Sequence, residues 1–192
     1  MAGDATLGWP GRVRAHGLAS QAVEWTGARY ADTPTVEDEI WIDARPERVW
    51  EIVAAVEEMP SMSEELRAVE WCDGATGPAV GARFVGYSKH DALGEWSTTS
   101  YVVECTAPET LAWAVTDPDD PSARWRFTLR PEGAGTRLSQ WVQLGPGRSG
   151  LSFAIDAMPD KEQKIVFVRL REFEAGIRRT LAAVKERAEA AR

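Results

Sequence analysis

Cysteine and histidine are scarce in this sequence of 192 residues, which has two of each. Cys72 and Cys105 lie far apart, and two unclustered thiols indicate a reducing compartment more than a disulfide-stapled scaffold. Neither the cysteines nor the two histidines have the spacing of a zinc site. No glycine-rich phosphate loop precedes a predicted helix. We therefore expect no bound metal and no cofactor.

Long apolar runs and excess positive charge are also lacking. No run reaches the roughly 18 apolar residues of a membrane span, and the N-terminus has no apolar stretch typical of a signal peptide. The formal net charge is −8, so the surface is poorly suited to the phosphates of a nucleic acid. These features predict a cytoplasmic protein without a transmembrane segment or a nucleic-acid partner, and they leave a homodimer open.

Tryptophan, by contrast, is abundant, with nine residues. Large aromatic side chains supply core area, and they also line apolar ligand sites. The length fits one domain with an appendage more readily than two domains. A domain of about 150 residues buries roughly 70% of the surface of its unfolded chain, which is enough for a core with a pocket.

The last stretch, residues 159–192, predicts one long helix. Apolar residues recur in it every three or four positions, the spacing that places side chains on one helical face. They are Val166, Leu170, Phe173, Ile177, Leu181 and Val184. A helix of this length would run roughly 45 Å at about 1.5 Å per residue, and Pro159 suits its first turn. Because it has one apolar stripe and a net positive charge, we expect it to dock on the acidic remainder of the chain.

Residues 36–144 predict an antiparallel sheet with two helices near its start. A strand over 36–43 precedes a helix over 44–59 that ends at Pro60, and a short second helix over 61–66 is capped by Ser61 or Ser63. Further strands follow over 67–74, 81–90, 95–106, 110–117, 123–132 and 135–144. The breaks between these strands are short, which favours a meander and an α+β fold. Residues 145–158 form a glycine-rich bridge to the long helix.

The alternation along these strands predicts which residues face inward. The inward set is Phe84, Gly86, Ser88, His90, Trp96, Thr98, Ser100, Val102, Leu111, Trp113, Val115, Trp125, Phe127, Leu129, Leu138, Gln140 and Val142. This face mixes large aromatic residues with polar ones. A solid core avoids polar groups that lack partners, so the mixture favours a cavity with some polar lining. A bulge in any strand would reverse its phase.

Residues 1–34 differ from the remainder and are predicted to form an arm outside a domain over 35–192. They are rich in Gly, Ala and Thr and have no sustained periodicity. One interpretation is a flexible arm. The other is that Trp9, Trp25 and Tyr30 hold the arm over a groove of the domain or on a partner.

Several motifs, taken in order, resemble those of one known family. They are IWIDARPERVWEIV at 40–53, EMP at 58–60, VEWCDG at 69–74, VGARF at 80–84, the strand from Trp96 to Glu104, WRFTLRP at 125–131, GTRL at 135–138 and PDKEQKIV at 159–166. Over about residues 36–190 the chain resembles the START-like helix-grip (SRPBCC) superfamily, in its polyketide cyclase/dehydrase and lipid-transport branch.

This resemblance implies a curved antiparallel sheet wrapped around the long C-terminal helix, with a deep apolar cavity between them. Family members bind lipids, polyketides or hormones there, and a minority catalyse cyclisation or dehydration. The ligand-cavity residues that we expect are Phe84, Ser88, Trp96, Thr98, Trp113, Trp125, Phe127, Gln140, Val166, Leu170 and Phe173. Met62 and Glu64 stand near the expected cavity mouth, where the family pattern has an aromatic residue and a proline.

Candidate catalytic residues are few. His90 and Ser88 are the best, because an imidazole readily exchanges a proton near neutral pH. An exposed histidine at a hairpin is the alternative for His90. Tyr87 is predicted to point outward, and Gln140 or Glu104 could orient a polar group of a ligand.

Three classes of function follow. We favour a carrier of a hydrophobic small molecule such as a lipid or a polyketide, because no concentrated catalytic set is present. The alternative is a polyketide cyclase or dehydratase acting in the same cavity. A third hypothesis is that the arm and the basic helix bind a protein or an acidic lipid surface.

Overall fold

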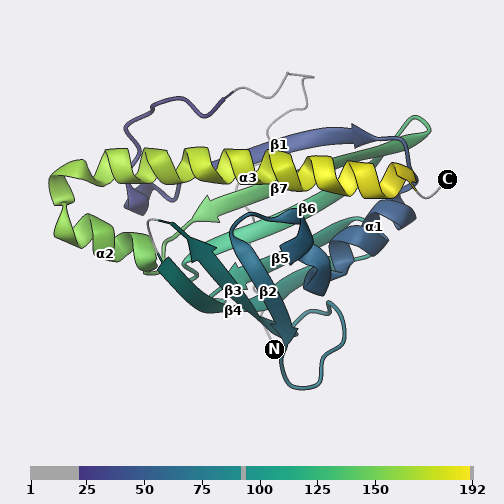
Figure 1. Ribbon diagram of the computed structural model, residues 1–192, viewed down its shortest axis with the longest axis horizontal. Helices are drawn as coiled ribbons and strands as arrows, with labels where there is room; N and C mark the ends of the chain where they lie inside the picture. Colours follow the sequence, from purple (N-terminus) through teal and green to yellow (C-terminus); the bar gives the residue numbers. More distant parts are fainter. Residues whose placement is uncertain (1–21, 92–93, 191–192) are drawn as a thin grey trace, which may run out of the picture.

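The computed structural model describes residues 22–91 and 94–190, and its strands form one antiparallel sheet under a long helix (Figure 1). With η marking a 3-10 helix, the elements are η1 (Tyr30–Asp32), β1 (Thr35–Ile42), α1 (Pro46–Ala54), η2 (Val56–Met62), β2 (Leu66–Trp71), β3 (Arg83–His90), β4 (Gly94–Thr106), β5 (Thr110–Val115), β6 (Ala123–Glu132), β7 (Gly135–Leu144), α2 (Gly150–Ala157), η3 (Pro159–Lys161) and α3 (Glu162–Ala190). The predicted α+β helix-grip fold is confirmed.

The sheet has seven strands in the order β1-β7-β6-β5-β4-β3-β2. Strands β2 to β7 form a meander in which each pairs with the next, and β1 returns to pair with β7. A bulge between Val102 and Glu104 shifts the register of β4 against β5. It lies beyond the predicted inward residues of β4, so their phase is retained.

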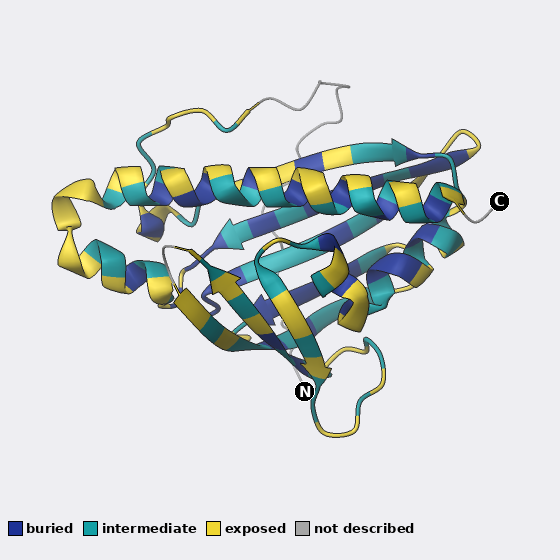
Figure 2. Cartoon of the chain, viewed as in Figure 1, coloured by how far each residue is buried: buried dark blue, intermediate teal, exposed yellow. Residues whose placement is uncertain are grey.

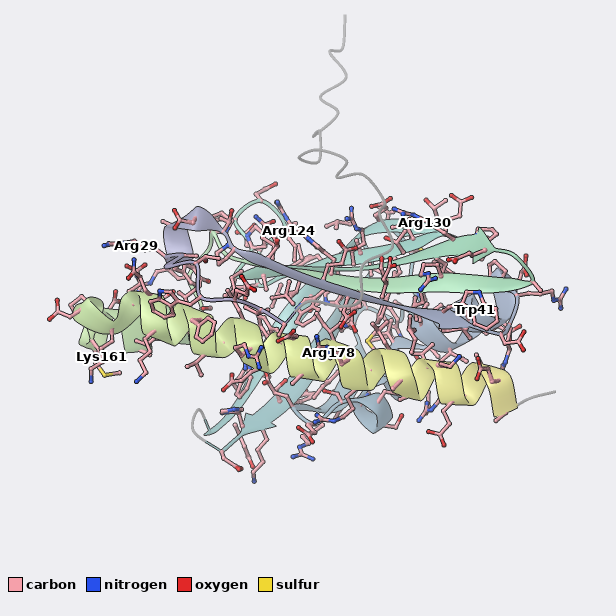
Figure 3. The ribbon with its side chains drawn as sticks, turned by 90° about the horizontal axis from the view of Figure 1, so that it is seen from above. Arg29, Trp41, Arg124, Arg130, Lys161 and Arg178 are labelled. Atoms are coloured by element: carbon pink, nitrogen blue, oxygen red, sulfur yellow. The ribbon has the colours of Figure 1, made fainter. Side chains whose placement is uncertain are left out.

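Helix α3 lies along the sheet and contacts β1 and β7. In Figure 1 it crosses the whole molecule, with α2 at its N-terminal end and α1 near its C-terminal end. Figure 3 shows α3 and β1 running side by side, with Arg178 labelled near the middle of the helix. Its Nε donates to Asp38 Oδ2 of β1 over 2.9 Å, which joins the helix to this edge of the sheet.

The apolar stripe of α3 is buried as its spacing predicts. Val166, Ile177, Leu181 and Val184 are at most 2% exposed, and Figure 2 shows buried and exposed residues alternating along the helix. The helix runs for 29 residues, or roughly 43 Å at about 1.5 Å per residue. Most of the stability of this helix must come from its packing, since the intrinsic helix propensity of its residues alone contributes little.

Two details of the helical segments differ from the prediction. The α-helix ends at Ala54, and Pro60 lies inside η2 instead of ending a helix. Residues 63–65 are not helical, because Ser63 Oγ accepts hydrogen bonds from the backbone N–H groups of Glu65 and Leu66. A serine that bonds to its own neighbours in this way offers the backbone an alternative to a helix.

Helix α2 lies within the segment that was predicted to be a bridge. The glycines around it argue against a helix, but Ser149 caps it by accepting a hydrogen bond from Leu151 N at 3.2 Å. This capping serine is the signal that the sequence interpretation missed.

The described part of the arm, residues 22–34, contacts α3 and the loop before α2. Val23 N donates to Glu174 Oε1 over 3.0 Å, and Trp25 packs edge-on against Phe167 with ring centroids 5.3 Å apart. The hydroxyl of Tyr30 donates to the carbonyl of Gly147 over 2.7 Å. Trp9 lies outside the described residues, and a flexible arm stays a prediction.

Candidate functional site: a cavity between the sheet and the long helix

A cavity of about 1350 Å³ lies between the inner face of the sheet and α3. Of the predicted ligand-cavity residues, those that line it are Phe84, Ser88, Trp96, Thr98, Trp113, Trp125, Phe127, Gln140 and Phe173. They come from β3, β4, β5, β6, β7 and α3, so the cavity spans most of the sheet. Whether a ligand contacts them stays a prediction.

Val166 and Leu170 were expected in this lining and are not part of it. Both are core residues, 1% and 5% exposed. At about 100° per residue, Leu170 lies roughly 60° around the helix from Phe173, which does line the cavity. Val166 lies about two turns before Phe173, and the lining residues of α3 begin only at Arg169.

The aromatic side chains of the cavity form a continuous wall. Trp113 is at its centre, stacked on Trp125 with centroids 6.3 Å apart and in contact with Phe84 and Phe127 at 6.1 and 6.0 Å. Phe173 of α3 meets Trp125 edge-on at 5.1 Å. The wall therefore bridges sheet and helix through offset and edge-on ring pairs, the arrangements that aromatic side chains prefer.

Gln140 is the polar exception in the β7 part of the lining. It is 6% exposed, and its Oε1 has no hydrogen-bond partner among the described residues. In the strand register it lies between Asp38 of β1 and Phe127 of β6. A buried amide oxygen in this position is available to a molecule in the cavity.

A charged cluster borders the cavity where α3 meets the segment before β2. The guanidinium of Arg169 donates to both oxygens of Glu65, at 2.6 and 2.8 Å, and to Glu172 at 2.9 Å. It also lies 4.3 Å from the ring centroid of Phe173. Burial alone would lower the pKa of Arg169, but the bonds to Glu65 and Glu172 raise it above its ordinary value, so the residue stays charged.

His90 belongs to the same cluster. Its Nε2 lies 3.5 Å from Glu172 Oε1, and its side chain is 27% exposed and lines the cavity. The side chain at this hairpin is therefore half-buried, because Glu172 of α3 lies next to it. A catalytic role for His90 or for Ser88 stays a prediction. Tyr87, in contrast, points outward as predicted and donates to Glu70.

A second ion pair joins the same two segments. Arg179 of α3 pairs with Glu64, and both residues line the cavity. Their side chains are 44% and 72% exposed, so the cavity reaches solvent here. Glu64 was expected near the cavity mouth, and it lies there, whereas Met62 is buried in the core.

The sequence interpretation missed Arg169, Glu65 and Glu172 as part of the site. The available signal was the position of Arg169, one turn before Phe173 on the edge of the apolar stripe. Its partner Glu65 is 104 residues earlier, and such a pairing becomes visible only in the fold. Among the described residues, no group of His, Cys, Asp and Glu side chains is placed to hold a metal ion.

A curved sheet that grips a long helix, with an aromatic cavity between them, defines the helix-grip class of proteins. The chain matches the family described as "Polyketide cyclase / dehydrase and lipid transport" over residues 33–189, and it belongs to that family.

Solved structures agree with this assignment. The Polyketide_cyc-like protein Cgl2372 from Corynebacterium glutamicum is 28% identical, with a TM-score of 0.60 over 81% of this chain and 91% of its own. The di-domain ARO/CYC proteins StfQ, from the steffimycin pathway, and BexL, from the BE-7585A pathway, share the fold with TM-scores of 0.64 and 0.61 at 13% and 19% identity. The match covers 81% and 82% of this chain but half of each di-domain protein.

No protein with a curated description matches the chain significantly. No helix in the described ranges is long and apolar enough to cross a membrane.

Proposed function

We propose that this protein binds a hydrophobic small molecule, lipid-like or polyketide-like, in the cavity between the sheet and α3. The single observation that carries the proposal is the cavity itself, which has about 1350 Å³ and an aromatic wall reaching from β3 to α3. Ligand sites are typically concave, mostly apolar and furnished with a few polar groups, as this cavity is. Membership of the polyketide cyclase and lipid-transport family supports the same class of ligand.

The first test is native mass spectrometry of freshly purified protein, followed by organic extraction of whatever dissociates. A stoichiometric hydrophobic adduct is expected, and its extract gives the ligand class. A ligand-free mass, together with no thermal shift from palmitate or from the aromatic polyketide emodin, would contradict the proposal.

A matched pair of tryptophan variants locates the binding site. Trp96 lines the cavity on β4, whereas Trp141 is not in the lining and lies against Arg126. Trp96→Ala should weaken binding of the extracted ligand or of emodin by about tenfold, since a stacked aromatic contact is lost. Trp141→Ala should leave the affinity unchanged. Equal affinities in the two variants would show that the ligand does not bind in the cavity.

The cyclase or dehydratase alternative is favoured by one observation, the pairing of His90 with Glu172 inside the cavity lining. An imidazole next to a carboxylate can take and return a proton while the cavity holds a flexible chain in one conformation. The test is turnover of a poly-β-keto thioester by wild type and by His90→Ala. Turnover that is lost in the variant would support an enzyme, and unchanged turnover would assign the chemistry elsewhere.

A further inference from the structure

We propose that Gln140 selects the ligand by accepting a hydrogen bond, so that the preferred ligand is a flat aromatic molecule whose buried end carries a hydroxyl group. The inference rests on the proposed function and specifies the chemistry of its ligand. It begins from Gln140 Oε1, which is buried, borders the cavity and has no hydrogen-bond partner among the described residues.

The neighbours of Gln140 explain why the protein itself does not satisfy this oxygen. Asp38, opposite it on β1, has only acceptor atoms in its side chain, and Phe127, opposite it on β6, has no polar atom. The cationic partner of Asp38, Arg178, binds Asp38 through Nε at 2.9 Å and Glu174 through Nη2 at 2.9 Å. The remaining side from which a donor can reach Gln140 Oε1 is the cavity.

An amide oxygen accepts hydrogen bonds and cannot donate them, which defines the ligand group that fits. A hydroxyl supplies the missing proton, whereas a methyl group, an ether oxygen or an ionised carboxylate cannot. A ligand that covers this oxygen without donating to it leaves a buried acceptor unpaired and loses affinity.

The aromatic wall fixes the shape of the rest of the ligand. Phe127 is the register partner of Gln140, and its ring lies 6.0 Å from that of Trp113. A guest that bonds to Gln140 therefore has its body among these rings, where flat aromatic molecules pack best. The two observations together specify a phenol-like group on a planar skeleton.

The experiment compares 2-naphthol with 2-methylnaphthalene, which has nearly the same shape but a methyl group in place of the hydroxyl. Both are titrated against wild type and against Gln140→Met, which keeps the length of the side chain and removes the amide. The matched control is Gln143→Met, the same change three residues further along β7 and outside the cavity lining. Gln140→Leu is the second variant in case the first folds poorly.

In wild type, the ratio of the two dissociation constants measures how strongly the hydroxyl is favoured. We expect Gln140→Met and Gln140→Leu to reduce that preference about tenfold, the usual effect of one buried hydrogen bond, and Gln143→Met to retain it. A third probe, 2-methoxynaphthalene, accepts hydrogen bonds but does not donate them, and it should behave like the methyl compound.

The contrary outcomes are distinct. If both probes bind wild type and the preference is the same in Gln140→Met, the inference is overturned and the proposed function stands. If the methoxy compound shares the preference of 2-naphthol, the amide donates instead of accepting, and the inference is also overturned. If neither naphthalene binds wild type, the inference and the proposed cavity for flat hydrophobic molecules fail together.

Discussion

Arg169 and Gln140 are both buried polar residues in the cavity wall, and they differ in whether their polar atoms have partners. Arg169 is held by Glu65 and Glu172, so the cost of burying its charge is offset. Gln140 Oε1 lacks such a partner in the described residues, so no hydrogen bond offsets the free-energy cost of burying this oxygen. Removing the two side chains should therefore change stability in opposite directions.

Arg169→Met should lower the free energy of unfolding by about 2 kcal/mol, because it leaves Glu65 and Glu172 next to each other without the cation. The value lies below that of a fully buried pair, since Glu65 is 30% exposed. Urea denaturation measures it. The control is Lys164→Met on the exposed face of the same helix, which should change stability by less than about 0.5 kcal/mol. Equal effects of the two substitutions would show that the cluster does not stabilise the fold.

Gln140→Leu should raise the free energy of unfolding of the ligand-free protein by about 1 kcal/mol, since a buried acceptor without a protein partner is replaced by an apolar group. The same denaturation experiment, carried out without ligand, checks it. A loss of stability would mean that ordered water or a protein donor already satisfies the amide.

At the scale of elements, Tyr30 connects the chain before β1 to the loop before α2. Its hydroxyl donates to the Gly147 carbonyl at 2.7 Å, and Ser149 Oγ lies at 3.1 Å. Gly147 itself has no room for a side chain, because a Cβ there would meet Asp120 O at 2.0 Å. This close approach allows the loop to pack where Tyr30 can reach it.

Tyr30→Phe should lower the free energy of unfolding by about 1–2 kcal/mol at pH 8, because the hydroxyl and its acceptor are both buried. Tyr87→Phe, at an exposed tyrosine, should change it far less. Urea denaturation of the two variants measures the difference, and equal effects would exclude an anchoring role for Tyr30.

The contribution of Tyr30 should also depend on pH. Burial raises the pKa of Tyr30 above its ordinary value, so the folded protein holds this proton more tightly than the unfolded chain does. The stabilisation is complete below the unfolded pKa of about 10 and is lost as the pH rises through the folded value. The advantage of wild type over Tyr30→Phe should accordingly shrink between pH 8 and pH 11. A constant difference over that range would contradict the shift.

At the scale of the whole molecule, Gly176 affects both the space in the cavity and the stability of α3. This glycine lines the cavity, and outside its chain neighbours and the backbone of its own helix no atom lies within 4 Å of where its Cβ would be. A glycine inside a helix costs roughly 0.5–1 kcal/mol relative to alanine. The chain therefore accepts a less stable helix where a side chain would occupy the cavity.

Two substitutions at Gly176 should separate stability from ligand binding. Gly176→Ala should raise the free energy of unfolding by about 0.5–1 kcal/mol and retain the ligand. Gly176→Phe should place a ring inside the cavity, so that the stabilisation that the ligand gives wild type, about 2.7 kcal/mol at a hundredfold excess over Kd, is reduced. Thermal denaturation with and without the extracted ligand, or with 2-naphthol, measures both effects. A full ligand shift in Gly176→Phe would place the binding site elsewhere.

The sequence by itself determined the periodic features of this protein. The apolar stripe of α3 and the inward phase of β3 to β7 follow from spacings of 3.6 and 2 residues, which depend on the local chain. These spacings also placed Trp113 and Gln140 on the inner face of the sheet, where both line the cavity.

Only the tertiary structure decided which side of α3 faces the cavity and which charges meet across it. Leu170 and Phe173 belong to one apolar stripe, but the rotation of the helix against β1 buries the first in the core and exposes the second to the cavity. The pairing of Arg169 with Glu65 joins residues 104 positions apart. Such contacts are set by how the layers pack, because local spacing fixes which residues share a face but not what that face meets.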